Sequence, residues 1–191
     1  MDDVRLLERI RGGDENAFAE LFARHRVVVH RYAVHMAGRD SADDIVQEVF
    51  LALLRQLDRF DASQGELRSY LLGIARRQAL KRFVRQGADR WPGNGHEDAS
   101  EPIAQPAYPA DPLEELTRAE AVARVRTAIA ALPPVYREAV VLCELNELDY
   151  AAAAEIMECP IGTVRSRLHR ARALLVARLR DMKPRTANCA E

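Results

Sequence analysis

A proline- and glycine-rich segment, residues 87–112, limits more than any other feature how this chain can fold. Five of the nine prolines lie in this segment, together with three glycines and few apolar side chains. Such a composition cannot bury enough apolar surface to offset the conformational entropy lost on folding. The 191-residue chain is therefore expected to form two separate folded units joined by a linker.

The flanking segments show the 3.6-residue apolar period of amphipathic helices, whereas the alternation typical of strands is scarce. A short helix is expected over residues 3–10, followed by a long helix that Asp14 caps and Gly38 ends. A third helix is expected to begin at Ser41 in a motif resembling a capping box. A fourth is expected over residues 66–86, so that residues 1–88 can bury one core.

The segment after the linker has the same period. Val122, Val125, Ile129 and Leu132 are expected on the inner face of its first helix, and Pro134 suits the first turn of the next. We therefore predict an all-α fold of two small helical domains joined by a flexible linker. The boundaries are a domain at 1–88, a linker at 89–112, a domain at 113–183 and a tail at 184–191.

Residues 149–183 predict a helix-turn-helix. Asp149 is a good N-cap for a short first helix, and Pro160 suits the start of a second, longer one. The apolar residues of the second helix recur at spacings of three and four: Val164, Leu168, Ala171 and Leu175. Its other faces are basic, so that this helix could lie in a DNA major groove. The alternative is a helical hairpin with a solvated basic face.

Two further charged faces lie within residues 1–88, although 28 basic and 29 acidic residues leave the whole chain nearly neutral. The first is an acidic face off the core positions, made by Asp44, Gln47, Glu48 and Arg55 beside Phe50 and Leu51. It could dock on a basic protein groove, or it could be the polar side of a plain amphipathic helix. The second is a basic stripe with a spacing of four: Arg77, Lys81 and Arg85. It could hold a nucleic-acid backbone, or it could only aid solubility.

Catalytic, metal and membrane functions find no support. The cysteines Cys143, Cys159 and Cys189 are too widely spaced for a disulfide framework or a paired-cysteine metal site. His25, His30 and His35 turn by about 140° per step on a helix and share no face. There is no phosphate-binding glycine loop or nucleophile elbow, and no apolar run approaches a membrane span. We expect no catalytic residue, cofactor, metal or membrane insertion, and a reducing cytoplasm as the location.

Two segments together resemble a known family. Residues 43–50, Asp-Asp-Ile-Val-Gln-Glu-Val-Phe, resemble the polymerase-binding helix of bacterial sigma factors. Residues 132–140, 150–155 and 159–172 resemble the promoter-reading C-terminal domain of these factors, and the Cys-Pro-Ile-Gly-Thr-Val-Arg-Ser-Arg-Leu string is the most specific part. Because a proline-rich linker stands in place of a long middle domain, the sequence is most similar to the extracytoplasmic function (ECF) subgroup of the sigma-70 family.

The resemblance implies a transcription initiation factor, not an enzyme, that directs core RNA polymerase to promoter DNA. A cognate anti-sigma factor, soluble or membrane-anchored, would hold it inactive until a stress or external signal. The implied polymerase-binding residues are Asp43, Asp44, Gln47, Glu48, Phe50, Leu51 and Arg55. The implied minus-10 residues are Tyr70, Arg76, Arg77, Lys81 and Arg85. The implied minus-35 residues are Thr163, Arg165, Ser166, Arg167, His169 and Arg170.

Two competing functions and one departure from the family pattern stay open. A stand-alone helix-turn-helix repressor or activator would need only the C-terminal half and would leave the acidic helix unexplained. An interaction protein or small enzyme would use a cleft at the linker. Glu158 stands at a turn position that the family usually fills with glycine. A left-handed backbone there would cost a non-glycine residue on the order of 1 kcal/mol.

Overall fold

The computed structural model describes residues 2–63, 65–85 and 114–181, and within these ranges every regular element is helical. The N-terminal half consists of α1 Asp3–Arg11, α2 Glu15–Ala37, α3 Arg39–Arg55, the short 3₁₀ helix η1 Leu57–Arg59 and α4 Leu67–Arg85. The C-terminal half consists of α5 Glu114–Ala130, α6 Pro134–Val140, the π-helical turn η2 Val141–Leu145, α7 Tyr150–Met157 and α8 Ile161–Asp181. The all-α prediction is confirmed. The predicted linker at 89–112 and tail at 184–191 lie outside the described residues.

The ends of α2 follow the local chemistry of its sequence. The Asp14 carboxylate accepts hydrogen bonds from the backbone N–H groups of Asn16 at 3.0 Å and Ala17 at 3.2 Å. Gly38 ends the helix with φ of 83°, a left-handed value that glycine adopts without strain. Both predicted caps of α2 are therefore confirmed.

Replacement of Asp14 by alanine should lower the free energy of unfolding by about 1 kcal/mol, because two N–H groups at the start of α2 lose their acceptor. Asp14→Asn is the matched control, since asparagine caps as well as aspartate but cannot form the ion pair with Arg9. Thermal unfolding should show a decrease of about 2–4 °C for Asp14→Ala. An equal decrease in melting temperature for both variants would show that the effect comes from loss of the ion pair with Arg9 and not from loss of the cap.

The third helix begins earlier than predicted. It starts at Arg39, directly after Gly38, so that Ser41 lies inside the helix and forms no capping box. It ends at Arg55, and η1 follows. Leu57 of η1 and Phe60, directly after η1, pack against the core.

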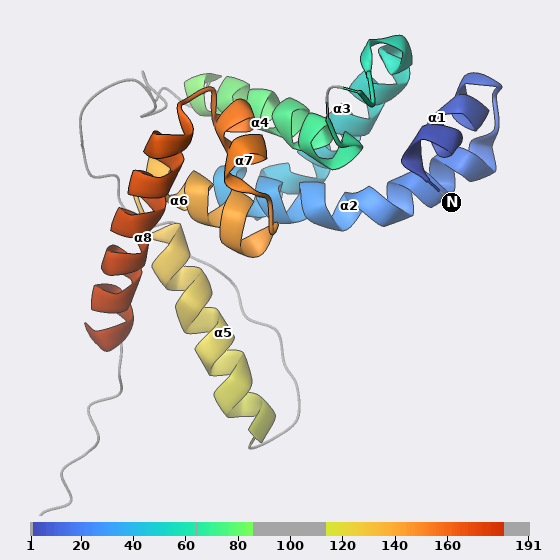
Figure 1. The fold of residues 1–191 in the computed structure, drawn as a ribbon. Coiled ribbons are helices and arrows are strands. Elements are labelled where there is room, and N and C mark those ends of the chain that lie inside the picture. Colours follow the sequence, from blue (N-terminus) through green and yellow to red (C-terminus); the bar gives the residue numbers. More distant parts are fainter. Residues whose placement is uncertain (1, 64, 86–113, 182–191) are drawn as a thin grey trace, which may run out of the picture.

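The C-terminal half is organised around α6 and α8. Pro134 occupies the first turn of α6 as predicted, and Leu142, Val164 and Leu168 are buried between the helices. Val122 and Val125, however, are 42% and 41% exposed, which corrects the expectation that they line a core. Figure 1 shows the reason, because α5 projects away from the body and only its C-terminal end packs against the neighbouring helices.

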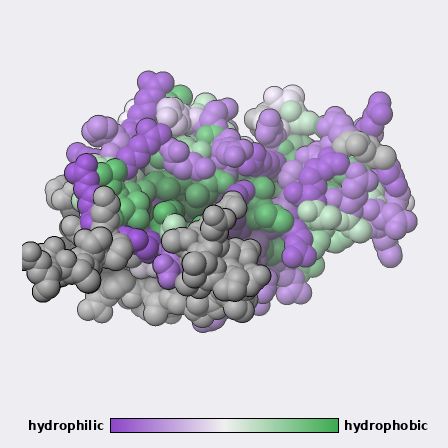
Figure 2. Space-filling view, turned by 90° about the horizontal axis from the view of Figure 1, so that it is seen from below, coloured by the Kyte–Doolittle hydropathy of each residue, from purple (hydrophilic) through white to green (hydrophobic). Residues whose placement is uncertain are grey.

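The two halves pack directly on each other. Figure 1 shows α6 and α7 lying against α2 and α4, and one cluster of buried residues extends through both halves. On the side from which α5 and α8 project, Figure 2 shows an apolar area bordered by hydrophilic residues. No helix in the described ranges is both long and apolar enough to cross a membrane.

Candidate nucleic-acid interface

The predicted acidic face is exposed along α3. It is formed by Asp43, Asp44, Gln47, Glu48, Leu51 and Arg55. Asp44 Oδ2 lies 3.4 Å from Arg82 Nη1 on α4, and this pair is open to solvent, so it adds little to stability. Leu51 and Leu54 are 37% exposed beside the acids. A partner would therefore meet fixed carboxylates, an amide and an apolar edge on one rigid helix.

Phe50 does not belong to this surface. Its side chain is 3% exposed, and its ring centroid lies 4.7 Å from that of Phe22 and 6.3 Å from that of Phe18. Position 50 is four residues after Val46, so both side chains face inward on the same side of α3. The expectation that Phe50 lies on the docking surface is wrong, and its packing instead orients the helix.

The predicted minus-10 residues on α4 fall into different surroundings. Arg77 and Lys81 are exposed, whereas Arg76 is 7% exposed beneath the C-terminal half. The ring of Tyr70 packs against that of Phe60 in a tilted arrangement, with centroids 5.4 Å apart. The backbone of Arg85 ends α4, and its side chain lies outside the described ones. Two residues of the basic stripe, Arg77 and Lys81, are thus open to solvent, and Arg76 beside them is covered.

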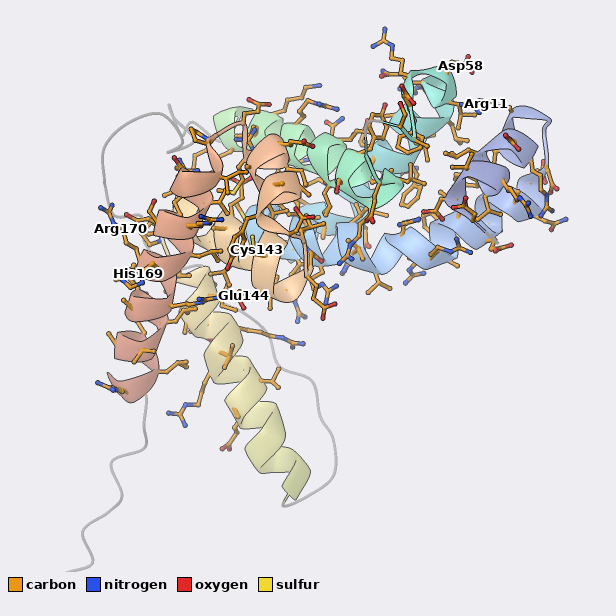
Figure 3. The ribbon with its side chains drawn as sticks, in the orientation of Figure 1. Arg11, Asp58, Cys143, Glu144, His169 and Arg170 are labelled. Atoms are coloured by element: carbon orange, nitrogen blue, oxygen red, sulfur yellow. The ribbon has the colours of Figure 1, made fainter. Side chains whose placement is uncertain are left out.

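The helix-turn-helix has the predicted form. Asp149 Oδ1 accepts a hydrogen bond from the Ala152 N–H at 2.7 Å and begins α7. On α8 the exposed predicted residues are Arg165, Ser166, His169 and Arg170. His169 and Arg170 lie at the opposite end of the molecule from the contact between Arg11 and Asp58 (Figure 3). These four side chains give α8 an exposed polar and basic face.

Local contacts hold several of these side chains. The guanidinium of Arg165 lies over the ring of Tyr150, 5.9 Å from its centroid, an arrangement that favours a cation. Arg170 Nη1 donates to the Tyr136 hydroxyl at 3.3 Å. Two predicted residues, Thr163 and Arg167, are only partly exposed. Arg167 Nη1 lies 3.9 Å from Cys159 Sγ. The backbone carbonyl of Thr163 accepts a hydrogen bond from Ser166 Oγ at 2.9 Å. Arg167 and Thr163 therefore support the helix more than they extend its surface.

Glu158 adopts the left-handed conformation that its position in the turn suggested, with φ of 53° and ψ of 46°. We expect Glu158→Gly to raise the free energy of unfolding by up to about 1 kcal/mol, because glycine has no Cβ to strain there. The matched control is Glu155→Gly, at an exposed helical position of α7, which should lower stability by about 1 kcal/mol. Chemical denaturation should give opposite signs for the two variants, and a shared sign would refute the strain argument.

A buried polar cluster joins the two halves, which the sequence did not predict. Glu138 of α6 is 1% exposed and accepts hydrogen bonds from the Tyr32 hydroxyl at 2.8 Å and from Arg76 Nε at 3.0 Å. Arg76 also donates to the Met157 carbonyl at 3.4 Å and lies 3.4 Å from Glu158 Oε1. Burial raises the pKa of Glu138, and the Arg76 guanidinium opposes that shift. Burial also raises the pKa of Tyr32 well above its usual value.

A second group of contacts lies beside this cluster. Asn146, which is fully buried, accepts from Arg31 Nε at 2.8 Å through its side chain and from Arg68 through its backbone carbonyl. Arg137 Nη1 donates to the His35 carbonyl at 3.3 Å. No sequence signal indicated these contacts, since Arg31, Arg68 and Arg137 resemble the exposed arginines of the chain.

His35 makes the stability of this region dependent on pH. Burial lowers the pKa of His35 to about 4, and three nearby arginines add to the shift. In the unfolded chain the pKa is near 6.5, so the contribution of His35 to stability is complete above pH 6.5 and is lost as the pH falls toward 4. We expect the difference in stability between the wild type and His35→Asn to shrink between pH 6.5 and 4.5. Denaturant titrations at several pH values measure this difference in the free energy of unfolding. A difference that stays constant with pH would contradict the lowered pKa of His35.

No other chemistry is indicated by the described residues. They contain no group of three side chains arranged to hold a metal ion. Cys143 and Cys159 are free and half-buried, and burial, assisted by Glu144, raises the pKa of Cys143 to about 11. A thiol with a raised pKa is a poor nucleophile at neutral pH.

Comparison with known proteins places both halves in one family. Sigma-70 region 2 matches residues 21–88, and sigma-70 region 4 matches residues 123–175. The ECF RNA polymerase sigma-E factor of Haemophilus influenzae is 32% identical over 187 residues, which cover 95% of this chain and 97% of that protein. The corresponding factor of Escherichia coli K12 is 34% identical over 179 residues, covering 90% and 91%.

Solved structures agree with this placement. CnrH in complex with the cytosolic domain of CnrY is similar with a TM-score of 0.64 and 25% identity, over 95% of this chain and 98% of that one. The sigma factor RpoE of Bartonella quintana, in complex with the anti-sigma factor NepR, gives a TM-score of 0.61 and 27% identity, over 85% and 96%.

The chain combines a helix-turn-helix with an acidic face on α3 and a basic face on α4, and both halves match sigma-70 regions. Together these features define a sigma factor of the sigma-70 type. The chain belongs to the ECF sigma-factor family, and it is a transcription initiation factor that directs RNA polymerase to promoters. The family as a whole is not enzymatic.

Proposed function

We propose that three separate surfaces of this chain divide the work of promoter recognition. The exposed acidic face of α3, from Asp43 to Arg55, docks on core RNA polymerase. Arg77 and Lys81 of α4, with Tyr70 and Arg76, contact the minus-10 element and its opened strand. Arg165, Ser166, His169 and Arg170 of α8 read the minus-35 element. The observation that carries the proposal is the clustering of these four residues on the one exposed polar face of the recognition helix.

Charge and geometry support each role. Guanidinium groups are the commonest readers of guanine in the major groove, and the ring of Tyr150 beneath Arg165 limits where that group can point. Exposed lysine and arginine on α4 suit contacts to phosphates, which fix the protein on DNA without reading its sequence. The chain has no described metal site and is proposed not to act as an enzyme. Its place is the cytoplasm, where polymerase and promoter DNA are found.

We also propose control by an anti-sigma partner. The similar CnrH and RpoE were each solved in complex with another protein, and the partner of RpoE is an anti-sigma factor. A protein that covered α3 or α8 of the present chain would block polymerase or DNA. The partner is expected to be soluble or anchored in the membrane by its own sequence.

Run-off transcription tests the proposed function. Purified bacterial core polymerase, this chain and a genomic promoter library should yield transcripts that start at a shared pair of minus-10 and minus-35 sequences. Tight, salt-resistant binding of the chain alone to an operator, without any transcript, would instead indicate a stand-alone regulator. Activity that persists in residues 1–88 alone, with no effect on transcription, would indicate an interaction protein or a small enzyme.

A further inference from the structure

A buried tyrosine of α6 touches the exposed polar face of α8. Arg170 Nη1 donates a hydrogen bond to the Tyr136 hydroxyl at 3.3 Å. The two residues differ in their surroundings, since Tyr136 is 9% exposed whereas Arg170 is open to solvent. A guanidinium that is proposed to read the minus-35 element is therefore in contact with a side chain of the core.

The backbone and the ring of Tyr136 are both held in place. Pro134 begins α6 and restricts its first turn, and the Tyr136 N–H donates to the Pro133 carbonyl at 3.0 Å. The ring belongs to the buried cluster, where α6 packs against α8. Because side chains in a close-packed core occupy defined rotamers, the Tyr136 hydroxyl has a set place relative to α8.

The contact can orient Arg170 without blocking it. A guanidinium has five N–H donors, and the bond to Tyr136 uses one of them, so that donors are left for the O6 and N7 acceptors of guanine. At 3.3 Å this bond is longer than the ~2.7–3.2 Å that is usual for N–H···O bonds. It therefore limits the directions of the guanidinium and still lets it move toward a base.

A second tyrosine holds the other proposed arginine reader of this face in a different way. The Arg165 guanidinium lies over the ring of Tyr150, which belongs to α7, at 5.9 Å from the ring centroid. Arg165 and Arg170 are five residues apart on α8, or about 7.5 Å along its axis. Since the two arginines are held by different helices, the contact of one can be removed while that of the other stays.

We propose that Tyr136 is a positioning residue, which sharpens the sequence preference at the base pair read by Arg170 without reading a base itself. This inference rests on the proposed function of α8. An arginine side chain loses rotamer freedom when it binds, and one that is already restricted loses less. The bond to Tyr136 should therefore favour the paired contact with the matching base over looser contacts with other bases, which allow the guanidinium other directions.

Three variants and one control isolate the hydroxyl. Tyr136→Phe removes the acceptor of Arg170 and keeps the ring, so that the core stays filled. Arg170→Ala identifies the base pair that Arg170 reads, and the double variant shows whether Tyr136 acts through Arg170. The matched control is Tyr32→Phe, which also removes a buried hydroxyl, but one that donates to Glu138 of α6 and to no residue of α8.

Transcription by core polymerase with the full chain, on a library with a randomised minus-35 element, is the measurement. A barcode in the transcribed region lets sequencing of the transcripts report the preference at every base pair. Tyr136→Phe should lower the preference at the Arg170 position by about two- to tenfold, which is the range expected for ordering one arginine side chain, and should leave the other positions unchanged. Tyr32→Phe should leave every position unchanged, whatever its effect on total output.

The possible failures give different patterns. If Arg170→Ala flattens one position while Tyr136→Phe leaves it unchanged or sharper, or only lowers output equally on all templates, the positioning role is refuted and the reading role of Arg170 stands. If the effect of Tyr136→Phe persists in the Arg170→Ala background, Tyr136 does not act through Arg170, and the positioning role is again refuted. If Arg170→Ala changes no position, the proposed reading role of Arg170 fails and the positioning role fails with it.

Discussion

The variant Asp44→Arg with Glu48→Arg should no longer co-elute with core RNA polymerase in size-exclusion chromatography. Both carboxylates are exposed on α3, and their reversal would place two cations against the basic groove that they are proposed to meet. Like charges opposed across an interface cost several kcal/mol. A loss of that size reduces an equilibrium constant more than a hundredfold, and transcription should fall with it.

The fold should survive this change, because neither carboxylate is buried. Asp44 gives up only a solvent-exposed pair with Arg82. Reversal of two exposed acids elsewhere, Glu8→Arg with Glu120→Arg, gives a matched change in net charge and should leave co-elution intact. Normal co-elution of the Asp44 and Glu48 variant would remove α3 from the polymerase interface.

Arg165→Ala should weaken promoter binding by about 1–3 kcal/mol, and only on promoters that keep the matching minus-35 sequence. Arg165 is exposed on the polar face of α8, and the ring of Tyr150 restricts its guanidinium. On a promoter with a scrambled minus-35 element, the wild type and the variant should bind equally. Footprinting of the polymerase holoenzyme on both promoters measures the difference.

Arg180→Ala is the control for simple loss of charge on the same helix. Arg180 is exposed but lies four turns beyond Arg165, near the end of α8. It should lower affinity slightly and by the same factor on both promoters, as a contact to phosphate would. Unchanged occupancy and unchanged sequence preference in Arg165→Ala would show that this residue reads no base.

Local chemistry explains which parts of the fold could be predicted from the sequence. Asp14, Gly38 and Asp149 act within three or four residues of themselves, so their roles are visible in a short stretch of sequence. The same holds for Glu158, whose left-handed backbone follows from its place between two helices. The apolar period also placed the outer face of α3 correctly, except at Phe50, where the core side of the helix is wider than the pattern indicated.

Long-range packing explains what could not be predicted. Glu138 meets Tyr32 and Arg76 across separations of 106 and 62 residues, and no periodicity within a helix reports on such pairs. Arg76 looked like its neighbour Arg77, yet the two differ in burial because only one is covered by the other half. Val122 and Val125 have the spacing of a core face, but α5 has no partner there within the described residues.

The buried glutamate of α6 has a consequence for how substitutions at Arg76 are interpreted. Glu138 is 1% exposed and accepts hydrogen bonds from Arg76 Nε and the Tyr32 hydroxyl. Removal of Arg76 would leave the Glu138 carboxylate buried without its counter-charge, and such a loss typically costs about 3–5 kcal/mol. A substitution of Arg76 would therefore weaken the packing of the two halves as well as any contact with DNA.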